Sequence, residues 1–280
     1  MSQDDWHFDK KPKTKITWKE EERDETAPYV SMNCIEIKGD ETPKEISVDV
    51  VIEEMYDVFL NDNYISSFLA SPRELEEMTV GHLIAEGHVS SANEISSIEF
   101  DGSKLLCKTK EPTKSKDEIV SSYLCDCSLW KFHQLTKNKT APDPDIRVKK
   151  DTLFDLIDHI FEEGKIWRRT GGAHSTIIAS PEGEVLAFCE DVSRASSVDK
   201  AIGKAALDGV KLHKCIMATS GRLSVTMVGK AVNARIPVMV SKAAPMDQGI
   251  KLAQENNVTL VGFARKPNLY IYANPERIVI

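Results

Sequence analysis

Three loops in the C-terminal half of the chain carry residues that could bind phosphate groups. Each loop follows a short apolar segment, at residues 214–218, 236–240 and 258–263, and these segments predict buried strands. Stretches 224–234 and 247–255, which lie between them, predict helices. Strands that alternate with helices form right-handed crossovers and pair in parallel. The three loops are therefore expected at one edge of a sheet, where the strands end.

This edge would suit a ligand that carries phosphates. Open α/β sheets bind ligands beyond the carboxyl ends of their strands, and two of the loops lead directly into helix N-termini, whose N–H groups and dipole attract anions. Four basic side chains add positive charge at the same place. The loops consist of Thr219, Ser220, Gly221 and Arg222, then Ser241, Lys242, Ala243, Ala244 and Pro245, and finally Ala264, Arg265, Lys266, Pro267 and Asn268.

Ordinary turns give an alternative interpretation of these loops, since Gly-Arg, Ala-Pro and Lys-Pro pairs are common in turns and helix caps. Three such loops at one edge favour a binding site over that alternative. Two nucleotide motifs are absent, because Gly221 lacks the glycine spacing of a Walker loop and no G-x-G-x-x-G follows a predicted strand. These absences weigh against nucleoside triphosphate hydrolysis and nicotinamide chemistry.

The composition bounds the class of protein. With 280 residues, 41% hydrophobic and 29% charged, the chain predicts a globular protein with one or two cores. It has no run of roughly 18 apolar residues for a membrane span and no apolar secretory signal, so we expect a cytoplasmic protein. The net charge of -8 argues against a nucleic-acid partner, and the six cysteines are expected to be reduced thiols.

Four regions are expected along the chain. Residues 1–30 are rich in charge and predict a flexible arm. Residues 31–135 predict a small α+β domain with a cysteine loop, and residues 136–150 a linker. Residues 151–280 are expected to form the domain that carries the phosphate-binding loops. The expected fold class is therefore α/β, with a larger C-terminal and a smaller N-terminal domain.

Capping signals and strand patterns place some elements within these regions. Ser71, followed by proline and by a glutamate three residues later, predicts the N-cap of a helix that Gly87 ends. Ser196 or Ser197 is expected to cap a helix in the larger domain. The alternating apolar pattern of residues 47–53 predicts a strand of the small domain.

Longer segments of the chain resemble the formate dehydrogenase accessory protein family. The likeness covers roughly residues 47–280 and keeps its order along that span, which argues against chance. In the N-terminal part, residues 81–89 are similar to the family's Gly-Phe-Leu-x-x-Glu-Gly segment. The other matching segments are Thr170-Gly171-Gly172-Ala173-His174, residues 190–194, 198–203, 219–222 and 227–231, Ile236-Pro237, Ala244-Pro245 and residues 259–265.

The resemblance implies a cytoplasmic sulfurtransferase. Such a protein takes sulfur as a persulfide from a cysteine desulfurase and passes it to the molybdenum cofactor of formate dehydrogenase, a bis-(molybdopterin guanine dinucleotide) that a guanine nucleotide would mimic. The resemblance also implies a homodimer and a C-terminal domain of the cytidine deaminase-like, three-layer type. By family likeness the cofactor site comprises Phe263, Ala264, Arg265, Lys266, Pro267 and Asn268, with Thr219, Ser220, Gly221, Arg222, Lys242, Ala244, Pro245 and His174 nearby.

The catalytic candidates are Cys125 and Cys127, which stand where the family has a Cys-Gly-x-Cys-Gly loop. Neither cysteine has a partner three residues away, but sulfur relay needs only one reachable thiolate that attacks a sulfane sulfur and then releases it. Asp126 would disfavour that thiolate, whereas Lys131 and His133 would favour it.

Other interpretations of these two cysteines stay open. By composition alone, packing of two small side chains beside the apolar segment 129–132 explains them equally well. A zinc site completed by His133 would lack a fourth ligand. Zinc-dependent deamination is disfavoured, because Thr176 and Met246 stand where that chemistry needs a glutamate and a cysteine.

Two functions therefore remain. The first is sulfur transfer. The second is an escort that holds the molybdenum cofactor or a guanine nucleotide without sulfur chemistry. The lost Cys-x-x-Cys spacing suggests the second, as does Ala195, where the family has a histidine.

The remaining polar residues have simpler expected roles. His174, taken alone, is a loop residue bonded to the backbone, and beside phosphates it would contact the ligand. Asp199 and Lys200 are expected to be a capping acid and a solvated lysine. The other cysteines lie in strand-like surroundings and are expected to be buried, namely Cys34, Cys107, Cys189 and Cys215.

Overall fold

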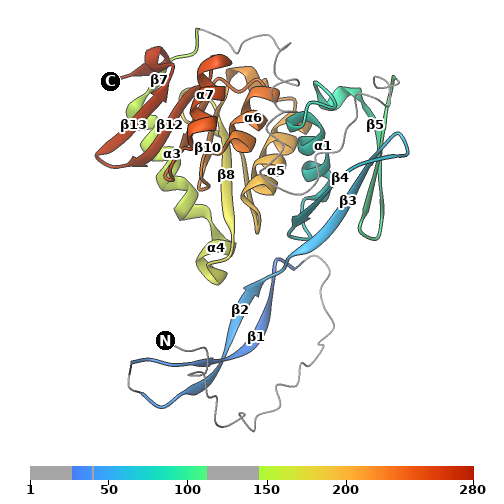
Figure 1. The fold of residues 1–280 in the computed structure, drawn as a ribbon, viewed down its shortest axis with the longest axis vertical. Coiled ribbons are helices and arrows are strands. Elements are labelled where there is room, and N and C mark those ends of the chain that lie inside the picture. Colours follow the sequence, from blue (N-terminus) through green and yellow to red (C-terminus); the bar gives the residue numbers. More distant parts are fainter. Residues whose placement is uncertain (1–26, 40, 112–144) are drawn as a thin grey trace, which may run out of the picture.

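The computed structural model describes residues 27–39, 41–111 and 145–280, and a six-stranded sheet is its largest element (Figure 1). Its strands are β8 (His174–Ala179), β9 (Val185–Asp191), β10 (Ile216–Thr219), β11 (Val238–Ser241), β12 (Thr259–Arg265) and β13 (Asn268–Ala273), in the order β13-β12-β11-β10-β8-β9. Strands β10, β11 and β12 run parallel, which confirms the prediction from alternating strands and helices. Strands β8 and β13 are antiparallel to their neighbours.

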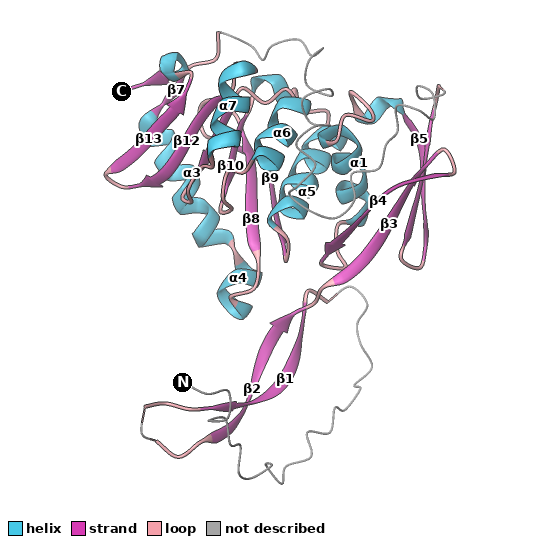
Figure 2. Cartoon of the chain, in the orientation of Figure 1, coloured by secondary structure: helices cyan, strands magenta, loops and turns pink. Residues whose placement is uncertain are grey.

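Helices cover both faces of this sheet (Figure 2). The amphipathic helix α3 (Lys150–Glu163) packs on one face, and the short helix α4 (Lys165–Thr170) follows it. The other face is covered by α5 (Arg194–Leu207), α6 (Val225–Asn233) and α7 (Asp247–Glu255). The mixed α/β class is therefore confirmed, and its assignment to the cytidine deaminase-like type stays a prediction.

A smaller sheet and one helix make up the N-terminal part. Strands β3 (Glu54–Leu60), β4 (Asn63–Ala70), β5 (Ile95–Asp101) and β6 (Lys104–Thr109) lie in the order β4-β3-β6-β5, beside α1 (Leu75–Ala85). Apolar residues of this part, such as Val58 and Leu105, belong to the same buried cluster as Met217 of β10. The two predicted domains thus share one core. The remaining short elements are β7 (Val148–Lys149), β14 (Ile278–Val279) and single 3-10 turns at Ala92–Glu94, Leu212–Lys214 and Pro275–Arg277.

Strands β1 (Tyr29–Glu36) and β2 (Lys44–Val51) pair only with each other and form a ribbon that extends from the body (Figure 1). The strand predicted at residues 47–53 therefore exists, but it belongs to this ribbon and not to the small sheet. Tyr29 and Val30, the last two residues of the predicted arm, belong to β1, and residues 1–26 lie outside the described residues.

Helices α1 and α5 cross with their backbones in contact. A Cβ atom on Gly81 would lie 1.7 Å from the carbonyl oxygen of Asp199, and one on Gly203 would lie 1.8 Å from that of Glu77. Both distances are far below van der Waals contact, so only glycine fits at either position. The crossing joins the N-terminal sheet to the central one.

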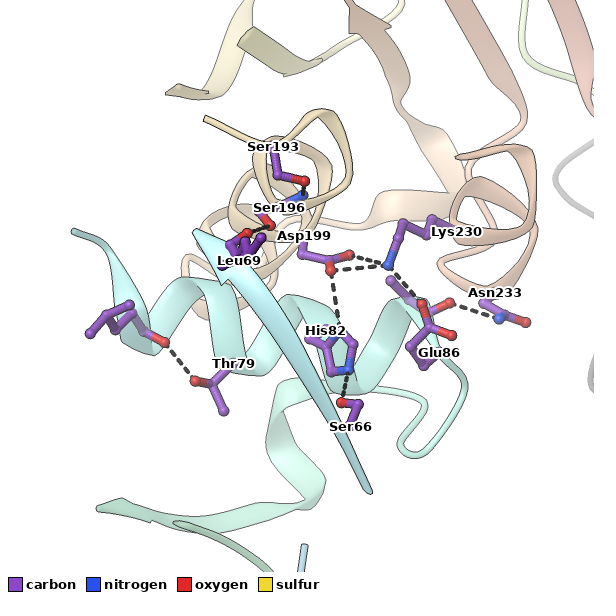
Figure 3. Close-up of polar contacts among 12 residues, drawn as sticks. Ser66, Leu69, Thr79, His82, Glu86, Ser193, Ser196, Asp199, Lys230 and Asn233 are labelled. Atoms are coloured by element: carbon purple, nitrogen blue, oxygen red, sulfur yellow. Dashed lines mark hydrogen bonds and ion pairs between the residues drawn. The ribbon is translucent and has the colours of Figure 1, made fainter. Parts of the chain in front are cut away.

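A network of buried charges lies beside this crossing (Figure 3). Lys230 of α6 is 2.9 Å from Asp199 of α5 and 2.7 Å from Glu86, which follows α1. The two ring nitrogens of His82 lie 3.2 Å from Asp199 and 2.7 Å from the hydroxyl of Ser66. Burial alone would raise the pKa of Glu86, but the ammonium of Lys230 outweighs burial, and the pKa falls to about 2. The network therefore stabilises contacts among β4, α1, α5 and α6.

A second buried ion pair contradicts the expected role of Lys200. Its ammonium lies 2.7 Å from Asp191, and neither side chain is exposed. It also donates a hydrogen bond to the carbonyl oxygen of Ser71 at 3.1 Å. The prediction of a capping Asp199 and a solvated Lys200 is wrong, because α1 packs on α5 and places both side chains in the interior.

Because of contacts in the same region, α1 begins later in the chain than the sequence predicts. The backbone N–H of Ser71 donates to Asp191 at 3.0 Å, and its hydroxyl accepts a backbone N–H from the segment after β9. Because tertiary partners occupy these groups, Ser71 does not cap the helix, which begins at Leu75 after Glu74 in a left-handed conformation. The predicted N-cap is wrong, whereas Gly87, with a φ of 80°, lies just beyond the helix end as predicted.

The N-cap of α5 also differs from the prediction. The cap is Ser193, whose hydroxyl accepts a hydrogen bond from the N–H of Ser196 at 3.4 Å. Ser196 and Ser197 lie inside the first turn and donate their own hydroxyl groups to the carbonyl oxygens of Leu69 and Arg194. Ser196 and Ser197 are both of a residue type that caps helices, but the hydrogen bonds of the folded chain select Ser193.

The substitution Gly81→Ala tests the helix crossing. We expect the free energy of unfolding to fall by at least about 3 kcal/mol, because the added methyl group meets the backbone of α5. Chemical denaturation followed by circular dichroism measures the change. The exposed residue Glu76 on the same helix supplies the control, and Glu76→Ala should change the free energy by less than about 0.5 kcal/mol. An unchanged midpoint for Gly81→Ala would contradict the packing described.

The low pKa of Glu86 makes stability depend on pH. A carboxylate whose pKa is lower in the folded state than its usual 4.5 stabilises the fold above pH 4.5, and this stabilisation is lost as the pH falls towards about 2. Glu86→Gln is therefore expected to lower the unfolding free energy at neutral pH by a few kcal/mol, with a difference from the native chain that shrinks in acid. Denaturation across this pH range measures the difference. The exposed Glu99→Gln is the control, and a difference for Glu86→Gln that stays constant would refute the assignment.

Candidate functional site

The three predicted loops meet at the carboxyl edge of the sheet, by which we mean the ends of β10, β11 and β12 with the residues that follow them. The hydroxyl of Ser241 donates to the carbonyl oxygen of Gly221 at 2.7 Å, which joins the first loop to the second. The N–H of Phe263 donates to the carbonyl oxygen of Ala243 at 3.1 Å, which joins the second to the third. A Cβ atom on Gly262 would lie 2.7 Å from the ring of Pro245. The expected convergence is therefore confirmed.

The third loop is shorter than the sequence suggested. Strand β12 runs on to Arg265, and only Lys266 and Pro267 form the turn into β13. The side chain of Ala264 is fully buried and faces the core, so it cannot contact a ligand at the surface. Phe263, by contrast, lies at a register irregularity with a φ of 50° and leaves 39% of its surface exposed.

A first hollow, of about 290 Å³, lies beside the loop after β10. His174, the first residue of β8, places its Nδ1 3.1 Å from the hydroxyl oxygen of Ser220. The backbone N–H of Ser175 donates to the same oxygen at 3.0 Å. We had expected His174 to bond to the backbone, but it bonds to a side chain. The lining residues are Ile160, Phe161, Trp167, Gly171, Gly172, Ala173, His174, Ser175, Val192 and Ser220.

Positive charge gathers around this first hollow. The pKa of His174 is lowered, first by burial and then by the nearby guanidinium groups of Arg194 and Arg222. A Cβ atom on Gly221 would lie 3.0 Å from the Cβ of Arg194, so the start of α5 touches the loop after β10. The ammonium of Lys242 lies 3.9 Å from the centre of the Phe161 ring. The hollow therefore combines an aromatic wall with neighbouring cations.

A second hollow, of about 530 Å³, lies on the hairpin formed by β12 and β13. Two aromatic rings in its lining, Phe263 and Tyr270, meet edge to face with their centres 6.0 Å apart. Lys266 also lines it, but its ammonium lies 3.0 Å from both Asp155 and Asp158 of α3, which raises the pKa of Lys266 and offsets its charge. The remaining lining residues are Arg265, Asn268 and Tyr272.

Two helix N-termini add to the attraction for anions. Helices α6 and α7 both begin after the loops of the carboxyl edge, and the side chains of their N-caps, Ser224 and Met246, accept no hydrogen bond from a backbone N–H of the helix. The N–H groups of each first turn therefore keep their partial positive charge. A phosphate at this edge would interact with these groups and with the basic side chains.

The proposed catalytic cysteines, Cys125 and Cys127, lie outside the described residues, as does His133. Burial raises the pKa of the Cys107 thiol to about 12 and that of Cys215 to about 11. It also raises the pKa of Cys189. These three cysteines are buried, as predicted, and a buried thiol with a raised pKa is a poor nucleophile. Cys34 is exposed, and its predicted burial is wrong.

One unexpected arrangement has the order of a hydrolytic triad. Ser66, His82 and Asp199 form a chain of side-chain contacts through the two nitrogens of the imidazole. All three residues are more than nine-tenths buried where α1 packs on β4 and α5. A substrate could reach the hydroxyl of Ser66 only if that packing opened, so the arrangement stabilises the fold and does not support hydrolysis.

Sequence reasoning missed the aromatic residues of the first hollow, and of the second hollow it named Phe263 but missed Tyr270 and Tyr272. Phe161 and Trp167 come from α3 and α4, and their rings meet edge to face 5.4 Å apart. Their spacing in the sequence is that of ordinary helix packing, so it gave no signal of a site. In the described segments, His, Cys, Asp and Glu do not gather into a group that could hold a metal ion. No helix in these segments is both long and apolar enough to cross a membrane.

The lowered pKa of His174 supplies a test of the charge at the first hollow. In Arg222→Gln we expect the pKa of His174 to rise towards its usual 6.5, because one of the two guanidinium groups that oppose protonation is removed. Histidine NMR signals followed across neutral pH measure the change. Arg235→Gln, at the exposed end of α6, is the control and should leave the titration unchanged. Equal titration curves for Arg222→Gln and the native chain would refute the assignment.

Comparison with known proteins agrees with this fold. Residues 51–279 match the FdhD/NarQ family. A protein named sulfur carrier protein FdhD from Methanothermobacter thermautotrophicus is 33% identical, over 85% of this chain and 92% of its own. Another of the same name, from Saccharolobus solfataricus, is 30% identical, over 88% of this chain and 96% of its own.

The fold itself also occurs in a solved structure. A crystal structure described as a formate dehydrogenase accessory protein from Desulfotalea psychrophila superposes with a TM-score of 0.74. The superposition covers 90% of this chain and 100% of the other, at 24% identity. With the family match over most of its length and relatives of at least 30% identity, this chain belongs to the FdhD/NarQ family.

Proposed function

We propose that this protein is a cytoplasmic sulfur carrier for formate dehydrogenase. It accepts sulfur from a cysteine desulfurase on Cys127 or Cys125 and delivers it to the bis-(molybdopterin guanine dinucleotide) cofactor of the enzyme. The name carried by its relatives supports the sulfur role. The observation that carries the cofactor role is the contact among three loops, which gathers cations, aromatic rings and helix N-termini at one edge.

The first chemical step is a thiol exchange. The thiolate of the carrier cysteine attacks the terminal sulfur of the desulfurase persulfide, the sulfur–sulfur bond of that persulfide breaks, and the desulfurase cysteine leaves as a thiolate. The sulfur then remains as a persulfide on the carrier. Its release as sulfide consumes two electrons, which a thiol reductant supplies.

The two hollows suit the parts of a guanine dinucleotide. A flat base can stack on the exposed rings of Phe263 and Tyr270 in the second hollow. Its phosphates are attracted by Arg222, Lys242 and Arg265 and by the N-termini of α6 and α7. Lys266 contributes less than its position suggested, since two carboxylates already offset its charge.

The second candidate is an escort that binds the cofactor without carrying sulfur. It is favoured by the missing Cys-x-x-Cys spacing around Cys125 and by Ala195 in place of the family's histidine. In either case the partners would be the formate dehydrogenase and a second copy of the chain. Only the carrier also needs a cysteine desulfurase.

Mass spectrometry of the intact protein tests the carrier function. After incubation with a cysteine desulfurase and cysteine, we expect the native chain to gain the mass of one sulfur atom, which a thiol reductant removes. Replacement of both Cys125 and Cys127 by alanine should abolish the gain, and the single variants should identify the acceptor. Cys34→Ala is the matched control, since Cys34 is exposed but lies outside the cysteine loop.

Guanine nucleotide binding separates the two candidates. Calorimetric titration with GDP should give the same affinity for the native chain and the double cysteine variant, because the binding loops are unchanged. If the native chain gains no sulfur but binds GDP, the escort function holds and the carrier function fails. If it gains sulfur and the double variant does so equally, neither cysteine is the acceptor.

A further inference from the structure

Helix α3 holds two of the cations that the sequence assigned to the carboxyl edge. The ammonium of Lys242 lies 3.9 Å from the centre of the Phe161 ring. The ammonium of Lys266 lies 3.0 Å from both Asp155 and Asp158. An aromatic ring carries no net charge and leaves the positive charge of Lys242 in place, whereas two carboxylates outnumber the single charge of Lys266. Of these two cations, α3 therefore withholds only Lys266 from an anion.

The ion pairs of Lys266 can open without disturbing the packing below them. Lys266 begins the turn between β12 and β13, and its side chain is 55% exposed. The side chains of Asp155 and Asp158 are 71% and 54% exposed, and ion pairs at such exposure stabilise a protein only slightly. Beneath them, Leu156 of α3 and Ala264 of β12 belong to one buried cluster. Apolar contacts thus hold the helix on the hairpin, and the ammonium is free to change partners.

The same ammonium lies within reach of the second hollow. Lys266 is one of the residues that line this hollow, as are Arg265 and Phe263. The four-carbon stem of a lysine is flexible and can turn the ammonium towards a new partner. The hydrogen bonds of Lys266 to Asp155 and Asp158 raise its pKa, so the ammonium stays charged at neutral pH. A phosphate in the hollow would therefore compete with two carboxylates for a full positive charge.

We propose that Lys266 exchanges Asp155 and Asp158 for a phosphate of the bound nucleotide, so that the two aspartates set the affinity of the second hollow. Before binding, the three side chains together carry one net negative charge, which opposes an anion. On binding, a phosphate replaces the carboxylates as the partner of the ammonium and forms charge-assisted hydrogen bonds with it. The inference rests on the proposed nucleotide site and adds to it two residues of α3 that do not line the hollow.

Two mechanisms would make the aspartates weaken binding, and they differ in their dependence on Lys266. Direct repulsion between the aspartates and the phosphates acts whether or not the ammonium is present. Exchange acts through the ammonium, so most of the effect of the aspartates disappears when Lys266 is removed. A double-mutant cycle between Lys266 and the two aspartates measures this difference as a coupling.

Calorimetric titration with GDP tests the exchange. We expect the paired substitution Asp155→Asn and Asp158→Asn to raise the affinity about fivefold, because it releases two exposed ion pairs, each with a small free energy. Lys266→Met should lower the affinity of the native chain by less than about twofold, since the aspartates already offset that charge. In the paired variant, Lys266→Met should lower it about fivefold or more. All three residues are exposed, so the variants should keep the fold.

The matched control is the paired substitution Asp151→Asn and Glu162→Gln. Both residues are exposed on α3, four positions before Asp155 and four after Asp158, and so lie along the same face of the helix. In the described part of the chain, neither pairs with Lys266. This control removes the same two charges and should change the GDP affinity by less than about twofold, because solvent and salt screen exposed charges. Guanosine, which lacks phosphates, should bind all variants equally.

The outcomes separate this inference from the nucleotide site itself. If the native chain binds GDP but the paired aspartate substitution has the same effect with and without Lys266, direct repulsion operates and the exchange is wrong. A guanosine affinity that changes as much as that of GDP would also overturn the exchange, because the aspartates would then act on the shape of the hollow. If neither the native chain nor any variant binds GDP, the proposed nucleotide site fails and the exchange fails with it.

Discussion

The crossing of α1 and α5 is the contact on which the rest of the structure depends. Gly81 and Gly203 let the two backbones touch, and no residue with a Cβ atom would allow that distance. The crossing brings His82 to Asp199 and Lys200 to the loop before α1. Since α5 begins at Arg194 beside the first hollow, the position of this helix also fixes part of the site.

Buried charges are favourable here only because each has a partner. Removing two ions from water costs more than their attraction returns unless geometry and hydrogen bonds are good. Lys230 bridges Asp199 and Glu86, and Lys200 pairs with Asp191, at distances of 2.7 to 2.9 Å. Loss of one member would leave an uncompensated buried charge. These ion pairs therefore fix the position of the N-terminal part on the central sheet more narrowly than apolar contacts alone would.

The carboxyl edge shows how a chain of negative net charge can attract anions locally. Arg194 and Arg222 lie close enough to His174 to lower its pKa, and helix N-termini open onto the same edge. The structure divides this edge into two hollows with different walls. The first is bounded by Trp167 and His174, and the second by exposed aromatic rings on the hairpin.

Local patterns predicted much of this arrangement. Alternating strands and helices gave the parallel core of the sheet and the convergence of its loops, because the handedness of crossovers leaves one solution. Predictions based on a single residue type were weaker. Ser71 and Ser196 have the chemistry of caps, but Asp191 and Leu69 occupy their hydrogen-bonding groups. Lys200 has the chemistry of a surface residue, but its partner 9 positions away is buried with it.

The sequence by itself determined the family, the α/β class and the positions of the loops at the carboxyl edge, since these follow from local period and from ordered motifs. Tertiary structure decided which charges are buried and which cations remain available to a ligand. It also decided that the ribbon stands apart from the small sheet. These features depend on contacts between residues far apart in the chain, such as Lys266 with Asp155 or Arg169 with Asp49, whose free energy no local pattern encodes.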